Sequence, residues 1–153
     1  MADLALGSTV LFLDFDGVLH PRGGAVAGER FCKKAMLEGL LREPELQHVL
    51  IVISSTWREV YPLRRLAQIF SDDIRHRIID TTPVLGGDAP DFLRYREIRA
   101  WLNLHPAVSR WAALDDAVDD FPHGQRASGI FTNPDVGLGD LELSRLRTLL
   151  TAG

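Results

Sequence analysis

The sequence predicts an α/β protein with a doubly wound, Rossmann-like parallel sheet of about five strands and flanking helices. Two observations support this fold class. Short apolar runs, of which 10–13 and 48–53 are the strongest, are typical of strands that are buried on both faces. These runs alternate along the chain with segments in which apolar residues recur at helical spacing, and alternating strands and helices build a parallel sheet.

The strands are predicted from apolar content and length. The first run, 10–13, is continuously apolar, and the second is rich in β-branched residues, which favour strands. The third run is short, the fourth ends in two acids, and the fifth is weaker. The expected strands are therefore 10–13, 48–53, 77–80, 111–114 and 129–132.

The helices are predicted from apolar spacing and from the prolines that interrupt or end them. Pro44 and Pro106 end two of the periodic segments, and Pro62 is tolerable only in the first turn of another. The expected helices cover about 29–42, 57–70, 92–105 and 141–150. The segments 20–28 and 81–91 are rich in glycine and proline and are expected to be loops, the first a flap and the second a small lid.

Length and charge limit the function classes. A chain of 153 residues fits one domain over 1–153, and its 46% apolar and 25% charged residues are ordinary for a globular protein. The net charge of −4 argues against non-specific binding of nucleic acid or anionic membranes, although it leaves local contacts open.

The single cysteine, Cys32, excludes a disulfide framework and a cysteine-based metal site, and we expect it to be a small buried residue. Residues 1–8 lack the basic start and long apolar run of a signal peptide. No apolar run approaches the length of a membrane span. These features predict a cytoplasmic protein without a membrane partner.

Two carboxylates follow the first strand directly. Asp14 and Asp16 stand at i and i+2, so both start on the same side of the chain, and Gly17 then allows a sharp turn. In open α/β sheets this carboxyl end of the strands is where ligands bind. Unpaired acids there are costly unless a metal ion or another cation accompanies them. The alternative is a simple acidic turn closed by Asp-Gly.

Polar side chains also follow two other predicted strands. Ser54 and Ser55 follow the second strand, and Asp115 and Asp116 follow the fourth. A parallel sheet gathers these ends at one edge, so they should meet Asp14 and Asp16. Two arginines, Arg94 and Arg96, stand near the start of a predicted helix. A cation at the start of a helix interacts unfavourably with the helix dipole, so this placement has no structural benefit. It is explained if one of the two arginines binds an anion.

This order of acid pair, hydroxyl, cation and acid pair resembles the haloacid dehalogenase-like (HAD) phosphohydrolase superfamily. Its four motifs are matched by 14–18 (DFDGV), by Ser54 after an apolar strand, by Arg94 with Arg96 as the alternative, and by 114–116 (LDD). The chain departs from the usual pattern because most relatives carry Lys as the cation. Arginine can bind phosphate bidentately, so the exchange is chemically reasonable. Signalling receiver domains carry similar groups in a different order, which does not fit this chain.

The segments 54–58 (SSTWR), 94–98 and 114–116 resemble more narrowly a small capless HAD branch, some of whose members are linked by inference to RNA repair. The resemblance implies an Mg²⁺-dependent phosphatase. Asp14 would be the nucleophile and Asp16 the general acid and base. Ser54, Ser55 and the cation Arg94 or Arg96 would bind the phosphoryl group. The metal would be held by Asp14, Asp16 (through its backbone carbonyl), Asp115 and Asp116.

The gaps between these motifs leave no room for a cap domain. Only 37 residues separate Asp16 from Ser54, and only 13 separate Asp80 from Arg94. An uncapped site favours a bulky phosphorylated substrate, such as a nucleic-acid end or a phosphoprotein, or closure by an oligomer partner. A catalytically silent HAD-like binding or regulatory module and a phosphotransferase stay open as alternatives.

Several other residues have two interpretations. His20 could contact substrate but is more simply a loop or packing residue, as is His123. Trp57 is equally compatible with a pocket and with the core, whereas Trp101 and Trp111 are expected in the core. Asp119 either contacts the metal ligands without binding the metal itself or lies in a solvated turn or at a helix N-terminus. The arginines Arg22, Arg58, Arg64 and Arg65 are expected to be scattered on the surface rather than to form a basic rim.

Overall fold

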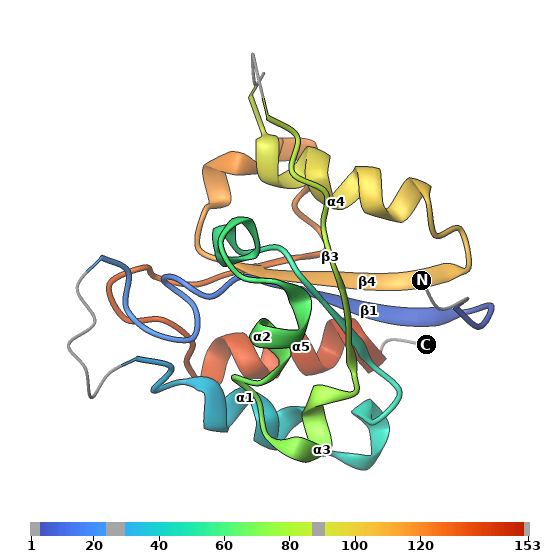
Figure 1. The fold of residues 1–153 in the computed structure, drawn as a ribbon. Helices are drawn as coiled ribbons and strands as arrows, with labels where there is room; N and C mark the ends of the chain where they lie inside the picture. Colours follow the sequence, from blue (N-terminus) through green and yellow to red (C-terminus); the bar gives the residue numbers. More distant parts are fainter. Residues whose placement is uncertain (1–3, 24–29, 87–90, 152–153) are drawn as a thin grey trace.

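The computed structural model describes residues 4–23, 30–86 and 91–151 and shows a parallel sheet with helices on both faces (Figure 1). The sheet order is β3-β2-β1-β4-β5. All four neighbouring pairs are parallel, which confirms the predicted doubly wound α/β fold. The strands are β1 (Ser8–Leu13), β2 (Leu50–Ile53), β3 (Ile78–Thr81), β4 (Val108–Asp115) and β5 (Gly129–Phe131).

The register of the central strands aligns their carboxyl ends. Leu13, the last residue of β1, pairs with Ile53 of β2 on one side and with Leu114 of β4 on the other. The residues that follow these three positions are therefore placed at the same edge of the sheet.

Five α-helices and four short 3₁₀ helices connect the strands within the described residues. The α-helices are α1 (Lys34–Leu41), α2 (Leu63–Ala67), α3 (Asp72–Arg75), α4 (Leu93–Asn103) and α5 (Asp140–Thr151). The 3₁₀ helices are η2 (Pro44–Leu46), η3 (Thr56–Glu59), η4 (Val118–Asp120) and η5 (His123–Gln125).

The two faces of the sheet carry separate hydrophobic cores. Side chains alternate along a strand, so Leu11 and Leu13 of β1 face the core formed with α1, α2, α3 and α5. Val10 and Phe12 face the smaller core under α4. Trp101 is buried in this second core and Trp111 packs against it, as expected from the sequence. In Figure 1, α4 lies above the sheet and the other four α-helices, α1, α2, α3 and α5, lie below it.

Two predicted helices differ from the observed ones. Helix α1 begins at Lys34 rather than near 29, because Phe31 adopts a left-handed conformation with φ of +58° that interrupts a helix. Cys32 therefore precedes the helix and is exposed, so its predicted burial is wrong. The predicted helix 57–70 is divided into η3 and α2, and Pro62, which has no N–H to donate, is the N-cap of α2.

Parts of the two predicted loops lie outside the described residues, namely 24–28 of the flap and 87–90 of the lid. Residue 29, where the first helix was expected to start, also lies outside them. No cap domain interrupts the described chain. No helix found in these ranges is long and apolar enough to cross a membrane.

Candidate active site

The chain turns sharply after β1 and leaves two acids at the edge of the sheet. The backbone N–H of Asp14 donates to the carbonyl oxygen of Leu114 (3.0 Å), which continues the β1–β4 ladder by one residue. Gly17 has a φ of +78°, and a Cβ atom there would collide with the carboxylate of Asp116. The turn therefore requires glycine, because only glycine combines this backbone conformation with so close an approach.

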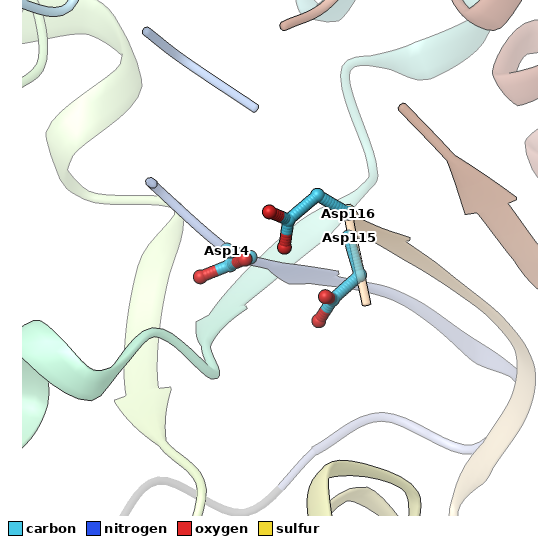
Figure 2. Close-up of side chains that lie close together, drawn as sticks. All are labelled: Asp14, Asp115 and Asp116. Atoms are coloured by element: carbon cyan, nitrogen blue, oxygen red, sulfur yellow. The ribbon is translucent and has the colours of Figure 1, made fainter. Parts of the chain in front are cut away.

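Three buried carboxylates converge at this edge (Figure 2). Asp14 follows β1, Asp115 is the last residue of β4, and Asp116 comes next in the chain. Each offers an oxygen within 4.8 Å of the others. Two of these carboxylates are oriented by the backbone, because the N–H of Phe15 donates to Asp14 Oδ1 and that of Ala117 donates to Asp115 Oδ1, each over 2.9 Å.

Arg94, in the first turn of α4, supplies the buried positive charge of the site. Its Nη1 lies 2.5 Å from Asp115 Oδ2 and 3.5 Å from Asp14 Oδ1, and its side chain is only 12% exposed. The backbone N–H of Arg94 donates to Asp120 Oδ2 (3.0 Å), which satisfies one of the unpaired amides at the start of the helix. Arg96 is exposed. Of the two arginines, Arg94 is the one beside the acids.

The electrostatics of the site are unbalanced, with one buried guanidinium for three buried carboxylates. Burial, and then the neighbouring Asp115, raise the pKa of Asp14 well above its ordinary value, and Arg94 opposes this rise only in part. Burial also raises the pKa of Asp115, although Arg94 and the Ala117 N–H favour its charged form. The pKa of Arg94 is raised: burial disfavours its charge, but the carboxylates of Asp115 and Asp14 more than compensate.

The residues of this cluster fit a divalent cation. Both carboxylate oxygens of Asp116 are buried, and neither accepts a hydrogen bond from the part of the chain that the structure describes. Arg22 Nη2 lies 2.9 Å from Asp116 Oδ2, but its side chain is 57% exposed. Buried carboxylates without donors are costly unless a cation binds them. An all-oxygen donor set suits a hard ion such as Mg²⁺ better than zinc.

Asp16 is held by His20 and Trp57, two residues for which the sequence left both a site contact and a packing role open. The backbone N–H of Phe31 donates to His20 Nδ1 (3.2 Å), which assigns the imidazole proton to Nε2. His20 Nε2 then donates to Asp16 Oδ1 (2.8 Å), and Trp57 Nε1 donates to Asp16 Oδ2 (3.2 Å). The side chain of Asp16 is still 40% exposed, so it is fixed in orientation and accessible from outside.

A pocket of about 400 Å³ opens over these groups. Its lining includes Asp14, Asp16 and Arg94, together with Arg22, Gly23 and Thr56. The hydroxyl of Thr56 was not predicted as a site group. An acid pair with one acid buried beside a cation and the other accessible can combine nucleophilic and general acid chemistry.

The two serines after β2 are placed differently from each other. Ser54 is buried at the end of the strand, and its Oγ has no hydrogen-bond partner among the described residues. Ser55 is also buried, but its Oγ accepts the N–H of Trp57 and caps η3. Neither serine lines the pocket. The hydrogen bond from Trp57 gives Ser55 a structural role, and the predicted contact of both serines with a phosphoryl group stays a prediction.

Arg58 is buried, so its expected place on the surface is wrong. Its Nη2 lies 2.8 Å from Glu97 Oε1 in an ion pair in which both side chains are at most 5% exposed. Its other hydrogen bonds go to backbone carbonyls in the loops after β2 and β3, at Ser54, Ser55, Thr82 and Pro83. The sequence pattern did not show this role, because an isolated arginine in a polar segment is normally solvated.

Asp119 and His123 lie outside the cluster. Asp119 is fully exposed and lies 3.8 Å from Arg126, and His123 is exposed as well. Arg64 and Arg65 are exposed on α2, as expected.

Comparison with known proteins gives one family. Residues 10–143 match the model of the family described as the HAD domain in Swiss Army Knife RNA repair proteins. The matched region begins in β1 and ends in α5, and so includes every residue of the cluster. No curated protein and no solved structure matches the chain.

Proposed function

Because this chain belongs to the family of HAD domains in Swiss Army Knife RNA repair proteins, which indicates phosphohydrolase-type chemistry in general, we propose that it is an Mg²⁺-dependent phosphatase. One observation carries this proposal. Asp14 is buried among two further carboxylates and Arg94, while Asp16 reaches the same pocket with its carboxylate exposed.

The metal ligands would be the side chains of Asp14, Asp115 and Asp116 and the backbone carbonyl of Asp16. When bound, Mg²⁺ would offset the repulsion between these carboxylates and an anionic phosphoryl group. The donors of the cluster are oxygens, and the uncompensated negative charge of the three acids supports a divalent ion there.

In the first step, a carboxylate oxygen of Asp14 attacks phosphorus in line and forms an aspartyl-phosphate, while the bond to the leaving oxygen breaks. Asp16 gives its proton to that oxygen. The hydrogen bonds from His20 and Trp57 hold Asp16 in one orientation, so the proton transfer does not wait for a rotamer change.

In the second step, Asp16, now a carboxylate, takes a proton from a water molecule that attacks the same phosphorus. The bond between phosphorus and Asp14 breaks, the carboxylate of Asp14 is restored, and inorganic phosphate leaves. The guanidinium of Arg94 lies between Asp14 and Asp115, so it is close to the phosphoryl group in both steps, before and after that group is bonded to Asp14. It would balance charge that develops on the phosphoryl oxygens.

Ser54 and Thr56 are the hydroxyl groups that we assign to the phosphoryl oxygens. The buried Oγ of Ser54 has no hydrogen-bond partner among the residues that the structure describes, and Thr56 lines the pocket. A ligand oxygen would satisfy the hydroxyl of Ser54, which otherwise costs desolvation free energy without a compensating bond.

The pocket has no cap domain above it in the described chain. Water exclusion therefore has to come from the substrate itself or from a partner. We assign a bulky phosphorylated substrate to this site, because such a substrate extends beyond the phosphoryl group and covers the opening.

Hydrolysis of 4-nitrophenyl phosphate tests the proposal. We expect turnover with Mg²⁺, none with a chelator, and a loss of at least about a hundredfold in the Asp14→Asn variant, which keeps the shape of the side chain but removes the nucleophile. Asp119→Asn, at an exposed acid outside the cluster, is the control and should keep full activity. Turnover that persists with chelator or in Asp14→Asn would contradict the proposal.

A further inference from the structure

A second pocket, of about 210 Å³, lies against the side of Trp57 and combines aromatic rings with arginines. Its lining includes three aromatic residues, Phe31, Trp57 and Tyr61, and two arginines, Arg30 and Arg65. None of these arginines belongs to the acid cluster described above.

The rings form a continuous aromatic surface rather than isolated contacts. The ring centroids of Phe31 and Trp57 are 5.2 Å apart, and those of Trp57 and Tyr61 are 5.7 Å apart. The guanidinium of Arg30 lies 5.9 Å from the centre of the Trp57 ring, within the range of a cation–π contact. Tyr61 is 40% exposed, so part of this surface is open to a ligand.

Trp57 joins this pocket to Asp16, which lines the active-site pocket. One edge of the indole donates from Nε1 to Asp16 Oδ2 (3.2 Å), and the ring also lines the aromatic pocket. The backbone of Phe31 is connected to the same acid through His20. A group bound in the aromatic pocket therefore lies on the side of Asp16, the residue that protonates the leaving oxygen in the proposed reaction.

The composition of the pocket favours a planar ring that is attached to an anionic chain. Aromatic side chains interleaved with arginines are typical of sites for single-stranded nucleic acid, where bases stack on the rings and guanidinium groups pair with phosphates. The volume suits one ring system, since sites for drug-sized ligands measure roughly 300–1,000 Å³. A phosphotyrosine would place its only phosphate at Asp14 and leave Arg30 and Arg65 without an anion.

We propose that this aromatic pocket binds the base next to the phosphate that is removed, so that the substrate is the phosphorylated end of a single-stranded nucleic acid. The inference rests on the proposed phosphatase function. The base stacks on Tyr61, which is the exposed ring. Trp57, inclined by 37° to Tyr61, and Phe31, inclined by 65° to Trp57, form the walls of the pocket. Arg30 and Arg65 pair with the next phosphodiester. The overall negative charge of the protein does not oppose this, because the arginines act locally.

Hexanucleotides that carry a terminal phosphate test the inference. The probes are RNA and DNA with the phosphate at the 5′ or the 3′ end, the same oligonucleotides with an abasic terminal residue, and a serine phosphopeptide. We expect kcat/KM for at least one intact end to exceed that for its abasic counterpart by about tenfold, in line with the contribution of one stacked base.

Two variants and a matched control locate the effect. Tyr61→Ala should reduce the ratio of kcat/KM between intact and abasic ends by about fivefold or more, because it removes a ring that contacts the base. Arg65→Ala should instead lower kcat/KM for both ends by a similar factor, because the phosphodiester that it pairs with is present in both. Arg64→Ala removes an exposed arginine of the same helix that does not line the pocket, and it should leave both kcat/KM values unchanged. Quenching of tryptophan fluorescence in the Asp14→Asn protein gives the affinity for the same oligonucleotides without turnover.

The two proposals fail in different ways. Equal kcat/KM for intact and abasic ends, or a preference for the phosphopeptide, in a protein that hydrolyses 4-nitrophenyl phosphate would overturn the base-binding pocket and leave the phosphatase standing. If no phosphate ester is hydrolysed, the phosphatase proposal fails. The fluorescence titration then still decides whether the pocket binds a base, and equal affinity for intact and abasic ends would overturn it.

Discussion

At the scale of single residues, the accessible acid of the site is fixed by a histidine and a tryptophan. The backbone N–H of Phe31 donates to His20 Nδ1, which leaves the imidazole proton on Nε2. His20 Nε2 donates one hydrogen bond to Asp16, and Trp57 Nε1 donates the second. A carboxylate held in this way is oriented before substrate arrives, which is what proton transfer requires.

His20→Gln tests this positioning role. Glutamine cannot reproduce both contacts of the ring, so Asp16 becomes free to rotate, and we expect kcat for 4-nitrophenyl phosphate to fall about tenfold with little change in KM. The exposed His123→Gln is the control. Because His20 is buried, thermal unfolding of each variant is measured as well. An unchanged kcat in a folded His20→Gln protein would rule out the positioning role.

Asp116 carries a buried carboxylate that the proposed metal ion would bind. Its buried oxygens accept no hydrogen bond within the described ranges, and the one cationic group that the structure describes within ion-pair distance is the guanidinium of the exposed Arg22, so the proposed cation would stabilise them further. We expect Asp116→Asn to raise Tm by a few degrees in chelator, since about 1 kcal/mol corresponds to roughly 2–4 °C for a chain of this size. The same variant should lose most of the increase in Tm that Mg²⁺ produces in the native protein.

Differential scanning calorimetry with and without Mg²⁺ makes this measurement, with the exposed Asp119→Asn as control. A wild-type Tm that does not respond to Mg²⁺ at millimolar concentration would contradict the metal site.

The raised pKa of Asp14 predicts a pH dependence with a definite sign. The folded protein binds a proton at this group more tightly than the unfolded chain does, because burial and Asp115 disfavour the carboxylate. Its contribution to the free energy of unfolding is therefore full below the ordinary pKa and is lost as pH rises through the raised value. In chelator, the Tm of Asp14→Asn relative to wild type should increase from pH 4 toward neutrality. A difference in Tm between Asp14→Asn and wild type that stays constant with pH would contradict the raised pKa of Asp14.

At the scale of elements, the buried ion pair between Arg58 and Glu97 connects three segments of the sheet edge. Arg58 lies in η3, its guanidinium donates to loops after β2 and β3, and Glu97 lies one turn after Arg94 in α4. Glu97 also accepts the backbone N–H of Leu85 (3.0 Å). The pair therefore sets the distance between α4 and the strand ends.

Glu97→Gln tests this connection. It leaves a buried guanidinium without its counter-charge, which typically costs about 3–5 kcal/mol. We expect a loss of stability near the lower figure, because glutamine keeps one acceptor, together with a lower kcat, because α4 carries Arg94. Glu59→Gln, at an exposed position of η3, is the control. Urea denaturation gives the free energy of unfolding, and a change below about 1 kcal/mol would contradict the role of the pair.

The strands were predictable from the sequence, and several helix boundaries were not. Continuous apolar runs such as 10–13 identify buried strands without further information, because both faces of a parallel sheet are covered. The start of α1 depends instead on Phe31, whose left-handed backbone is stabilised by a hydrogen bond to His20, eleven residues earlier. Helical spacing cannot show such a contact.

The acid cluster was predictable from the strands, because the carboxyl ends of neighbouring parallel strands lie at the same edge of a sheet and Asp14, Asp115 and Asp116 stand at two such ends. The partners of those acids were harder to find. The roles of His20, Trp57 and Arg58 depend on the direction in which side chains point from loops and on tertiary burial, neither of which has a periodic signal in the sequence. Only the spacing of His20, four residues after Asp16, hinted at its contact.

At the scale of the whole molecule, one parallel sheet brings the chemistry of distant segments to a single edge. The central strand β1 lies between β2 and β4, so Asp14 stands between Ser54 on one side and Asp115 on the other. This edge bears an acid pocket and, joined to it through Trp57, an aromatic pocket. The described chain places no cap domain over them, which supports the proposal of a large substrate.

The central claim is that Asp14 carries the phosphoryl group during turnover, and acid-quenched mass spectrometry tests it most directly. The leaving group of 4-nitrophenyl phosphate needs little protonation, so the first step can proceed without the general acid, whereas the second step needs Asp16 as the base. With this ester and Mg²⁺, the Asp16→Asn variant should therefore accumulate one phosphoryl group on the peptide that contains Asp14. Protein carrying Asp14→Asn as well should show none. Metal-dependent turnover by the native protein, with no phosphoryl group on that peptide in Asp16→Asn at any time, would contradict the covalent mechanism.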